Sequence, residues 1–331
     1  MDKGNSFLWG GGYRHIVSVE NLFGAWREFR RGKRKKPDVQ KFEHSLEDNI
    51  LRLHGELQAG IYACDPYVAF TVCDSKPRLI HKASVRDRLV HQAIFRVLYP
   101  LFDRRFITDS FSCRIGKGTH RGAARLHYFL RTERAKRRGT VYALKCDIRK
   151  FFDSVNQGIL ISLLEGYISD KKTLWLLRRI IGSFSVTDGV GLPLGNVTSQ
   201  LFANIYLHEL DCFLKYELRV DKYARYSDDF AVVGNDAAYL ALIAEIARRF
   251  LKHRLNLDLH EKKLTIRKYS QGVDFLGYVL FPSHKIIRTR TKRRMLARIA
   301  GGTLTEAASH SYAGMLGHCN GYKLSLKIID K

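Results

Sequence analysis

The sequence predicts an α+β fold in which an antiparallel sheet is backed by helices. Stretches of alternating β-forming residues recur at 66–81, 140–147, 223–235 and 257–281, and amphipathic segments with helical spacing separate them. Strands interspersed with helices in this way favour a sheet with helices packed on one face. The 331 residues are enough for a sizeable core and two or three subdomains.

The N-terminal part is predicted to be helical before the first strands begin. Residues 13–60 carry apolar side chains at helical spacing and end at Gly60, which suits a C-cap. Residues 66–81 alternate like two strands around a turn. Amphipathic helices are expected at 84–102 and 121–138.

The C-terminal part continues the alternation of strands and helices. A strand is expected to end at Asp147, and a loop bounded by Gly and Pro at 191–200 leads into a helix. We expect further elements in this order: helices at 160–168, 171–184 and 201–218, a hairpin at 223–235, a helix at 237–255, strands at 257–266 and 272–281, and a short basic helical tail from Ile287.

The charge balance indicates a polyanionic partner. Lys and Arg number 57 against 32 acidic residues, a formal net charge of +25. Nucleic acid is the simplest such partner, and a membrane surface is the main alternative. With no long apolar run and no signal peptide at the start, we expect a cytoplasmic protein without a membrane partner. The six scattered Cys residues are expected to be reduced and mostly buried.

Two adjacent carboxylates stand out in the stretch YARYSDDFAVVGN at 223–235. A pair of Asp residues in a turn is usually only solvated. Here Asp228 and Asp229 lie between β-forming runs, where crowded carboxylates would repel each other and lose hydration unless a cation neutralised them. Asp147, at the end of the run VYALKC, is a candidate third ligand. Hard oxygen ligands of this kind suit Mg²⁺, and a pair of such ions can promote phosphoryl transfer.

The order of four motifs resembles that of a reverse transcriptase. They are CDIRKFF at 146–152, LPLGNVTSQLFANIYLHELD at 192–211, YSDD at 226–229 and VDFLGYVL at 273–280. The resemblance covers about residues 70–281 and implies a right-hand polymerase with fingers, palm and a short thumb. It implies these parts: an N-terminal helical extension at 1–65, fingers at 66–139, a palm at 140–284 with a fingers-like helical insertion near 157–187, and a basic thumb at 285–331.

The resemblance also assigns the catalytic groups. Asp147, Asp228 and Asp229 match the family's catalytic metal ligands, and the carbonyl of Ile148 would face the triphosphate-bound ion. The implied cofactor is a pair of Mg²⁺ ions, for which Mn²⁺ could substitute. The primer 3′-hydroxyl would attack the α-phosphate of a dNTP, so catalysis would consist of positioning and charge neutralisation.

Further residues match the family's substrate-binding positions. Phe152 matches the steric gate against ribose; the alternative is that Phe151 and Phe152 are both core residues, and at least one of the two is expected to be. Lys76 and Arg78 match the groups that hold the triphosphate, and Lys263 resembles a lysine near it, with Lys262 as the competing alignment. The stretch Phe275, Leu276, Gly277 and Tyr278 resembles the primer grip. Arg86 and Arg88 are expected to support the template or the local fold.

The loop LPLGNVTSQ departs from the common family pattern. Most reverse transcriptases have Gln where this chain has Leu194 and Pro where it has Gln200, and Leu194 followed by Gly195 is similar to the enzymes of diversity-generating retroelements. Those enzymes copy a template RNA with frequent errors at adenine. The loop lies under the nascent base pair in the family, so loss of an amide there removes a contact worth about 1–3 kcal/mol of base selection.

Several alternatives stay open at this stage. A phage-defence reverse transcriptase with its own non-coding RNA, a group II intron or retron-like enzyme, and a non-catalytic RNA-binding scaffold all fit the charge. The expected partners are a structured template RNA, an RNA–DNA hybrid, dNTPs and, as in the resembled subgroup, a small basic accessory protein oligomer. The basic segments at 30–36, 134–138 and 288–294 are expected to contact phosphates. A bacterial or phage origin is expected from the resemblance.

Overall fold

The computed structural model describes residues 11–73, 77–136 and 139–329, and it divides the chain into two compact units. The first unit consists of Met1–Phe106, Arg149–Glu209 and Lys252–Leu257. The second consists of Ile107–Ile148, Leu210–Leu251 and Asp258–Lys331. The chain therefore passes back and forth between the units, and the expected subdomain boundaries stay predictions.

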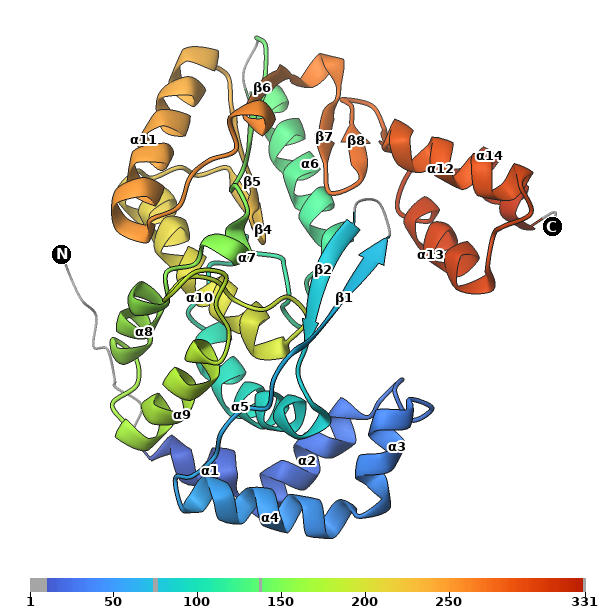
Figure 1. Cartoon of the computed structure of the whole chain (residues 1–331). Helices are drawn as coiled ribbons and strands as arrows, with labels where there is room; N and C mark the ends of the chain where they lie inside the picture. Colours follow the sequence, from blue (N-terminus) through green and yellow to red (C-terminus); the bar gives the residue numbers. More distant parts are fainter. Residues whose placement is uncertain (1–10, 74–76, 137–138, 330–331) are drawn as a thin grey trace. The chain divides into compact units, whose positions relative to one another are not determined.

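The first unit begins with the predicted helices (Figure 1). They are α1 (Gly12–Val17), α2 (Val19–Phe29), α3 (Pro37–His44), α4 (Leu46–Gln58) and α5 (Val85–Asp103). Ser18 caps α2 by accepting a hydrogen bond from the backbone of Asn21, as Ser commonly does at an N-cap. Leu22 and Trp26 of α2 are buried, as expected for the apolar side of an amphipathic helix.

The rest of the first unit contains a strand pair and a second group of helices. Strands β1 (Val68–Cys73) and β2 (Pro77–Lys82) pair antiparallel, with Phe70 opposite Ile80, which confirms the expected strands at 66–81. The turn between them falls largely at 74–76, outside the described residues. The helices that follow are α7 (Phe151–Ser154), α8 (Gln157–Glu165), α9 (Lys171–Gly182) and α10 (Val197–Cys212), whose last residues belong to the second unit.

An antiparallel sheet forms the centre of the second unit. Its strands are β3 (Tyr142–Asp147), β4 (Tyr223–Tyr226), β5 (Asp229–Gly234) and β6 (Thr265–Lys268), in the order β4-β5-β3-β6. Helix α6 (Thr119–Lys136) packs beside β4 and β5 (Figure 1) and buries Leu126 and Leu130 in a shared core with Ala224 and Ala231 of the sheet. Helix α11 (Ala237–Leu255) follows the hairpin. The predicted α+β class with a helix-backed antiparallel sheet is thus confirmed.

Two of the expected strands differ in detail. Only Thr265–Lys268 of the region expected at 257–266 forms a strand, because Glu261–Lys263 winds into a 3-10 turn. The stretch at 272–281 is a hairpin of two short strands, β7 (Val273–Phe275) and β8 (Tyr278–Leu280), and not one strand. Its two loop residues both have positive φ, 49° at Leu276 and 88° at Gly277, as tight hairpin turns of type I′ require.

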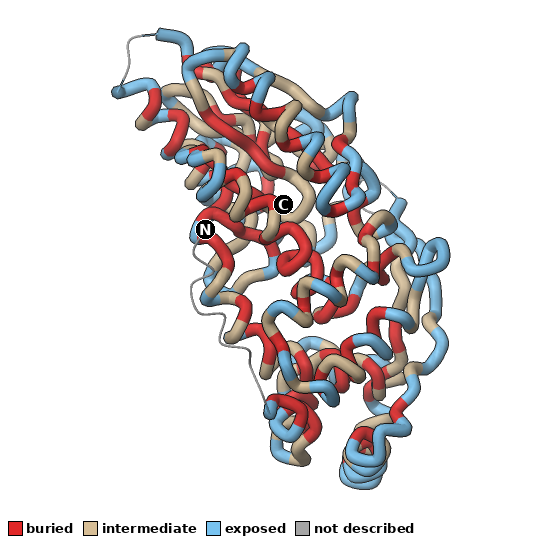
Figure 2. The backbone as a smooth tube through the Cα atoms, turned by 90° about the vertical axis from the view of Figure 1, so that its left-hand side faces the viewer, coloured by how far each residue is buried: buried red, intermediate tan, exposed pale blue. Residues whose placement is uncertain are grey.

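The second unit ends with β9 (Lys285–Ile287), which pairs with β8, and with the helices α12 (Thr289–Ala300), α13 (Glu306–Leu316) and α14 (Tyr322–Ile329). The expected helical tail is confirmed. Figure 2 shows buried and exposed residues alternating along the helices, as amphipathic packing requires. Among the described helices, none has the length and apolar character needed to cross a bilayer. Of the described Cys residues only Cys146 is buried, so the expected burial is wrong for the others.

Candidate active site

The three predicted aspartates meet at one end of the sheet in the second unit. Asp147 is the last residue of β3, and Asp229 is the first of β5. The two residues lie directly opposite each other in the antiparallel ladder, so their side chains project from the same face. Asp228 lies in the turn beside them, where its carbonyl accepts a hydrogen bond of 3.1 Å from the backbone N–H of Ile148. The chain therefore brings together residues that are about eighty positions apart in sequence.

The turn that carries Asp228 is the shortest that can join two paired strands. Tyr226 pairs with Asp229, which leaves only Ser227 and Asp228 in the loop. Ser227 has a φ of 55°, in the left-handed region that hairpin turns of this length use. The YSDD sequence therefore forms a tight turn whose geometry presents one carboxylate in the loop and the next at the strand end.

Two lysines of the same unit contact the carboxylates. Lys263 lies 2.6 Å from Oδ1 of Asp147, and Lys145 lies 3.7 Å from Oδ1 of Asp229. The contact with Asp147 favours Lys263 over Lys262 as the lysine of the site. The backbone carbonyl of Asp147 also accepts a hydrogen bond of 2.8 Å from His260, which holds the 3-10 turn against the end of β3.

Burial and mutual repulsion disfavour the charged forms of two of these acids. Burial, with added repulsion from Asp228 and Asp147 and opposed by Lys145, raises the pKa of Asp229 to about 6. Burial also raises the pKa of Asp228, and the negative charge of Asp147 adds to it. Crowded acids with raised pKa values are a common property of functional sites.

The chemistry of the carboxylates fits a hard divalent cation. Oδ1 of Asp229 is buried and has no hydrogen-bond donor within the described residues, so one ligand oxygen is available. Within the same residues, however, no three Asp, Glu, His or Cys side chains are gathered closely enough to enclose a metal ion. The ammonium group of Lys263 holds Asp147 in this structure, so binding of a cation by all three acids requires their side chains to change rotamer.

A buried arginine anchors the turn, and sequence reasoning did not single it out. Arg225 is fully buried in β4 and forms two bonds to the carboxylate of Asp211, at 2.7 and 2.6 Å. Its other donors reach the carbonyl of Ser227 at 3.1 Å and the hydroxyl of Ser110 at 3.1 Å. Tyr223 donates a further bond of 2.7 Å to Asp211. The signal in the sequence was a lone Arg within the apolar strand YARY, since a buried charge is rarely left without a partner.

The first unit joins three of the predicted substrate-binding segments by backbone hydrogen bonds. The N–H of His81 in β2 donates to the carbonyl of Leu194 at 3.2 Å. The N–H of Leu192 donates to the carbonyl of Phe152 at 2.7 Å. A side chain at Gly195, whose φ is 115°, would lie 3.1 Å from Ile80, so glycine allows this close approach. The loop at 192–196 thus lies between the strand pair and the start of α7.

Other predicted site residues divide into exposed and structural ones. Arg78 and Gln200 are exposed, and Leu194 and Phe152 are half-buried. Phe151 is buried against Phe152 and Tyr206, so Phe151 is the core residue of that pair. Lys76 lies outside the described residues.

Arg86 and Arg88 support the local fold, one of the two roles expected for them. Arg86 forms an ion pair with Glu56, and Arg88 forms one of 2.7 Å with Asp38. The rings of Tyr62 and Phe29 lie under the two guanidinium groups. Both arginines are therefore committed to contacts within the first unit.

The predicted primer-grip residues form the tip of the β7–β8 hairpin. Phe275 and Tyr278 are fully buried, and the Tyr278 hydroxyl forms a hydrogen bond of 2.6 Å with His120. Only Leu276 and Gly277 in the turn are partly exposed. Any direct contact with a primer therefore has to come from the turn. The two buried aromatic rings hold that turn in place.

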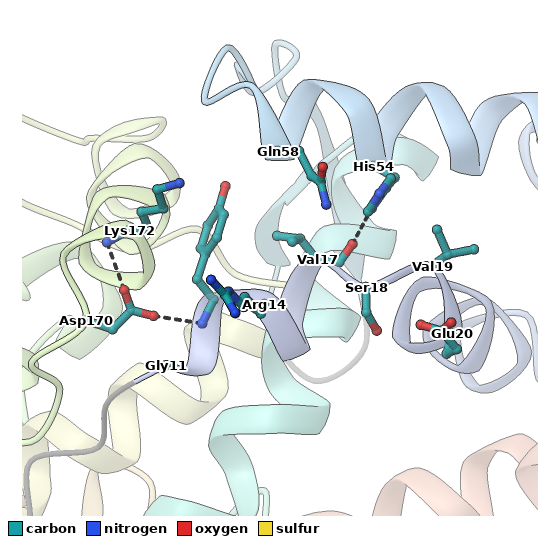
Figure 3. Close-up of a pocket in the computed structure, with 11 residues that line it drawn as sticks. Gly11, Arg14, Val17, Ser18, Val19, Glu20, His54, Gln58, Asp170 and Lys172 are labelled. Carbon is teal, nitrogen blue, oxygen red and sulfur yellow. Dashed lines mark hydrogen bonds between the residues drawn. The ribbon is translucent and has the colours of Figure 1, made fainter.

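A cavity of about 670 Å³ lies within the first unit, lined by residues of the N-terminal helices and of the start of α9 (Figure 3). Asp170 accepts hydrogen bonds from the backbone of Tyr13 and Lys172, both drawn in Figure 3. His54 bonds the carbonyl of Val17 at 2.7 Å. These polar groups tie α1 to α9 and α4, so we assign the cavity a structural role.

The fold and the carboxylate site define a nucleotidyl-transferring polymerase, and comparison with known proteins identifies the family. The model of the family "Reverse transcriptase (RNA-dependent DNA polymerase)" matches residues 73–280, more than half of the chain. The chain therefore belongs to the reverse transcriptase family.

The curated relatives are distant. Protein YkfC of Escherichia coli is 26% identical over 312 residues, covering 82% of this chain and 79% of YkfC. The group II intron-encoded protein LtrA of Lactococcus lactis is 23% identical over 303 residues, covering 70% of this chain. The match covers 49% of LtrA, so the chain spans about half the length of that relative.

Solved structures agree on the fold. Apo telomerase from Candida tropicalis matches 71% of this chain and 59% of its own with a TM-score of 0.50 and 13% identity. Telomerase from Candida albicans, solved with a fragment of telomeric RNA, matches 76% of this chain and 55% of its own with the same TM-score and 14% identity. At these identities the likeness shows the polymerase fold alone.

Proposed function

We propose that the chain copies a structured RNA template into DNA in a reaction that depends on Mg²⁺. The observation that carries this proposal is the convergence of Asp147, Asp228 and Asp229 at one end of the sheet. Membership of the reverse transcriptase family supports it. The proposed substrates are dNTPs and an RNA–DNA hybrid at the primer end.

The three carboxylates and the Ile148 carbonyl would hold the metal ions. When bound, Mg²⁺ would neutralise charge on the phosphates and activate the primer hydroxyl. The remaining work belongs to the protein: the tight turn keeps Asp228 beside the end of β3, and Lys263 supplies a positive charge next to Asp147. Phe152 would exclude a ribose 2′-hydroxyl, and Arg78 and Lys76 would bind the triphosphate.

Primer extension on an RNA template with dNTPs and Mg²⁺ tests the proposal. We expect Asp147→Asn and Asp228→Asn to abolish nucleotide incorporation, since each removes a charged ligand. Asp221→Asn is the matched control, because Asp221 is exposed just before β4. Retention of incorporation by the Asn variants at 147 and 228 would exclude this site as the catalytic centre.

We further propose that the enzyme is error-prone at template adenines, as in diversity-generating retroelements. Leu194 supports this, because an aliphatic side chain there cannot offer the hydrogen bond that an amide would give. Cloning and sequencing of the cDNA gives the error spectrum. Leu194→Gln should lower adenine errors, whereas Leu242→Gln, at an exposed position of α11, should leave them unchanged. Equal adenine error rates in wild type and Leu194→Gln would refute the role of Leu194.

A group II intron-encoded or retron-like function is the second candidate, and the similarity to LtrA favours it. The two candidates differ in the RNA that co-purifies and in the error spectrum. A template with a variable repeat and many adenine errors indicates a retroelement of the diversity-generating kind. An intron RNA copied faithfully indicates the second candidate, and a non-coding RNA from a defence locus indicates a phage-defence enzyme.

The proposed partners follow from the charge. The basic segments at 30–36 and 288–294 would contact RNA phosphates, and binding should weaken steeply as salt rises. A small basic accessory protein oligomer is a further proposed partner, supported only by the loop at 192–200. Purification of the tagged enzyme from its own host, followed by identification of bound RNA and protein, tests both proposals.

A further inference from the structure

Helix α6 of the second unit has one side against the sheet and another side that faces solvent. Leu126, Phe129 and Leu130 are buried in the core. The opposite side carries exposed residues at helical spacing: Arg121, Ala124, Tyr128, Arg131 and Ala135. Nothing in the polymerase site described above uses this side of the helix.

A groove of about 490 Å³ runs along this side between α6 and β9. We call it the α6 groove. Tyr128 and Arg131 line it from the helix and Lys285 lines it from the strand, and the small residues Ala124 and Ala135 also belong to its lining. His127 also lines it and is fixed by a hydrogen bond of 2.9 Å to the carbonyl of Phe281. No acidic side chain of the described residues lines the groove.

The positive charges in the groove are not neutralised by the protein. Within the described part of the chain neither Arg131 nor Lys285 forms an ion pair, and the Lys285 ammonium rests 4.9 Å from the ring centre of Tyr278. Burial lowers the pKa of His127, and the nearby charges of Lys285, Arg131 and His284 lower it further. Cations gathered without a carboxylate create a positive potential that favours an anionic ligand.

An aromatic ring stands beside these cations. Tyr128 is 56% exposed, so its ring is accessible to a ligand in the groove. Arg125 lies 5.4 Å from its ring centre and is itself held by a 2.7 Å ion pair with Asp109. The ring is thus supported from within the protein and presented to the groove.

We propose that the α6 groove binds a single-stranded segment of RNA outside the stretch being copied. A base would stack on Tyr128, and the flanking phosphates would contact Arg131 and Lys285. Stacking platforms within positively charged grooves are the usual way to hold a single strand without reading its sequence. An acidic peptide would satisfy the charges but leave the ring unused. The assignment to RNA rests on the proposed function. In a reverse transcriptase the template that has not yet been copied is single-stranded RNA, whereas the new DNA is paired with its template.

The test compares two substrates of the full-length protein. One, the short substrate, is a primed RNA–DNA duplex whose template ends just after a single templating nucleotide, and the other carries in addition a single-stranded RNA extension of about 12 nucleotides, within the usual site size for single-strand binding. The extension is placed at the 5′ end or at the 3′ end of the template. The variants are Tyr128→Ala and the double variant Arg131→Gln/Lys285→Gln. Tyr239→Ala and Arg249→Gln provide matched controls on α11, where both residues are exposed.

Affinity for the extended substrate should fall selectively. Tyr128→Ala should weaken it about 5-fold to 150-fold, the range for loss of one base–aromatic stack. The double variant should reduce the slope of log affinity against log salt by about 1.4, since each phosphate contact on a single strand contributes about 0.7. Single-nucleotide incorporation on the short substrate should match the wild type, which separates failure of the groove from failure of the polymerase site.

Three outcomes would overturn the proposal. Equal losses of affinity on the short and extended substrates would place the residues on the path of the duplex. Equal losses in the α11 controls would show that the effect does not depend on the groove. An unchanged affinity for RNA, with loss of binding to polyglutamate in the groove variants, would assign the groove to an acidic protein.

Discussion

Loss of the Arg225–Asp211 ion pair should separate folding from catalysis in this enzyme. Both side chains have no exposed surface, and the guanidinium bonds two oxygens of the carboxylate. The same guanidinium also bonds the carbonyl of Ser227, in the turn that carries Asp228. The pair therefore stabilises the sheet and fixes the turn that carries Asp228, one of the proposed catalytic residues.

The structure sets the size of each effect. Arg225→Met leaves Asp211 buried without its cation, which costs about 3–5 kcal/mol for a pair of this kind. The double variant Arg225→Met/Asp211→Leu removes both charges, and replacement of a buried pair by apolar residues is often neutral or stabilising by about 1–4 kcal/mol. It still loses the charged hydrogen bond to Ser227, worth about 1.5–3 kcal/mol. We therefore expect the double variant to be much closer to wild-type stability than the single variant.

Catalysis should not recover with stability. A displacement of about 1 Å in a catalytic group can cost about 100-fold in rate, so release of the turn should lower kcat in the double variant by tenfold or more. The KM for dNTP should stay within a factor of two, because the proposed triphosphate contacts lie elsewhere. Urea unfolding measures the first quantity, and single-nucleotide incorporation under Mg²⁺ measures the second. A double variant with wild-type kcat, or a single variant that loses less than about 1 kcal/mol, would refute this reasoning.

Two further predictions concern the first unit. Phe152→Val should admit ribonucleotides and lower the preference for dNTP over rNTP by about tenfold or more, measured as the ratio of the two kcat/KM values. An unchanged ratio would show that Phe152 does not contact the sugar of the substrate. His91 is buried, and desolvation, with a smaller effect from the charge of Arg88, lowers its pKa to about 4. Between about pH 6.5 and pH 4 the imidazole of His91 is therefore protonated in the unfolded chain and neutral in the folded one. From pH 7.5 to pH 5 the free energy of unfolding, measured by urea titration, should fall by about 2 kcal/mol more in the wild type than in His91→Gln. Parallel losses in the two proteins would show that His91 is not responsible.

The sequence predicted the parts of the fold that local patterns determine. Alternation and helical spacing correctly placed the helices around 13–60 and the hairpin at 223–235, because burial on one side produces those periods directly. The short strand β6 and the β7–β8 hairpin were less well predicted. Strands of three or four residues carry too little periodicity to be distinguished from a turn, and Leu276 has a positive φ that glycine or asparagine usually takes.

The candidate site shows the same division between local and long-range information. Asp147, Asp228 and Asp229 were found because ordered motifs mark them, and the register of β3 with β5 brings them together. The partner of Arg225 could not be found in this way. Asp211 lies fourteen residues earlier at the end of α10, and only the packing of that helix against the strand joins the two.

Burial explains why the cations around the acids have different roles. The side chain of Lys263 is 42% exposed, so water can solvate its ammonium group when the contact with the nearly buried Asp147 is broken. Arg225 is wholly buried, and its removal leaves a charge that water cannot reach. If the acids bind a divalent ion as proposed, the ion would displace the ammonium group of Lys263 from Asp147, whereas Arg225 would hold the turn with or without the ion. The two cations would then have complementary roles, because a cation that could not leave would block the metal and a cation that could leave would not fix the turn.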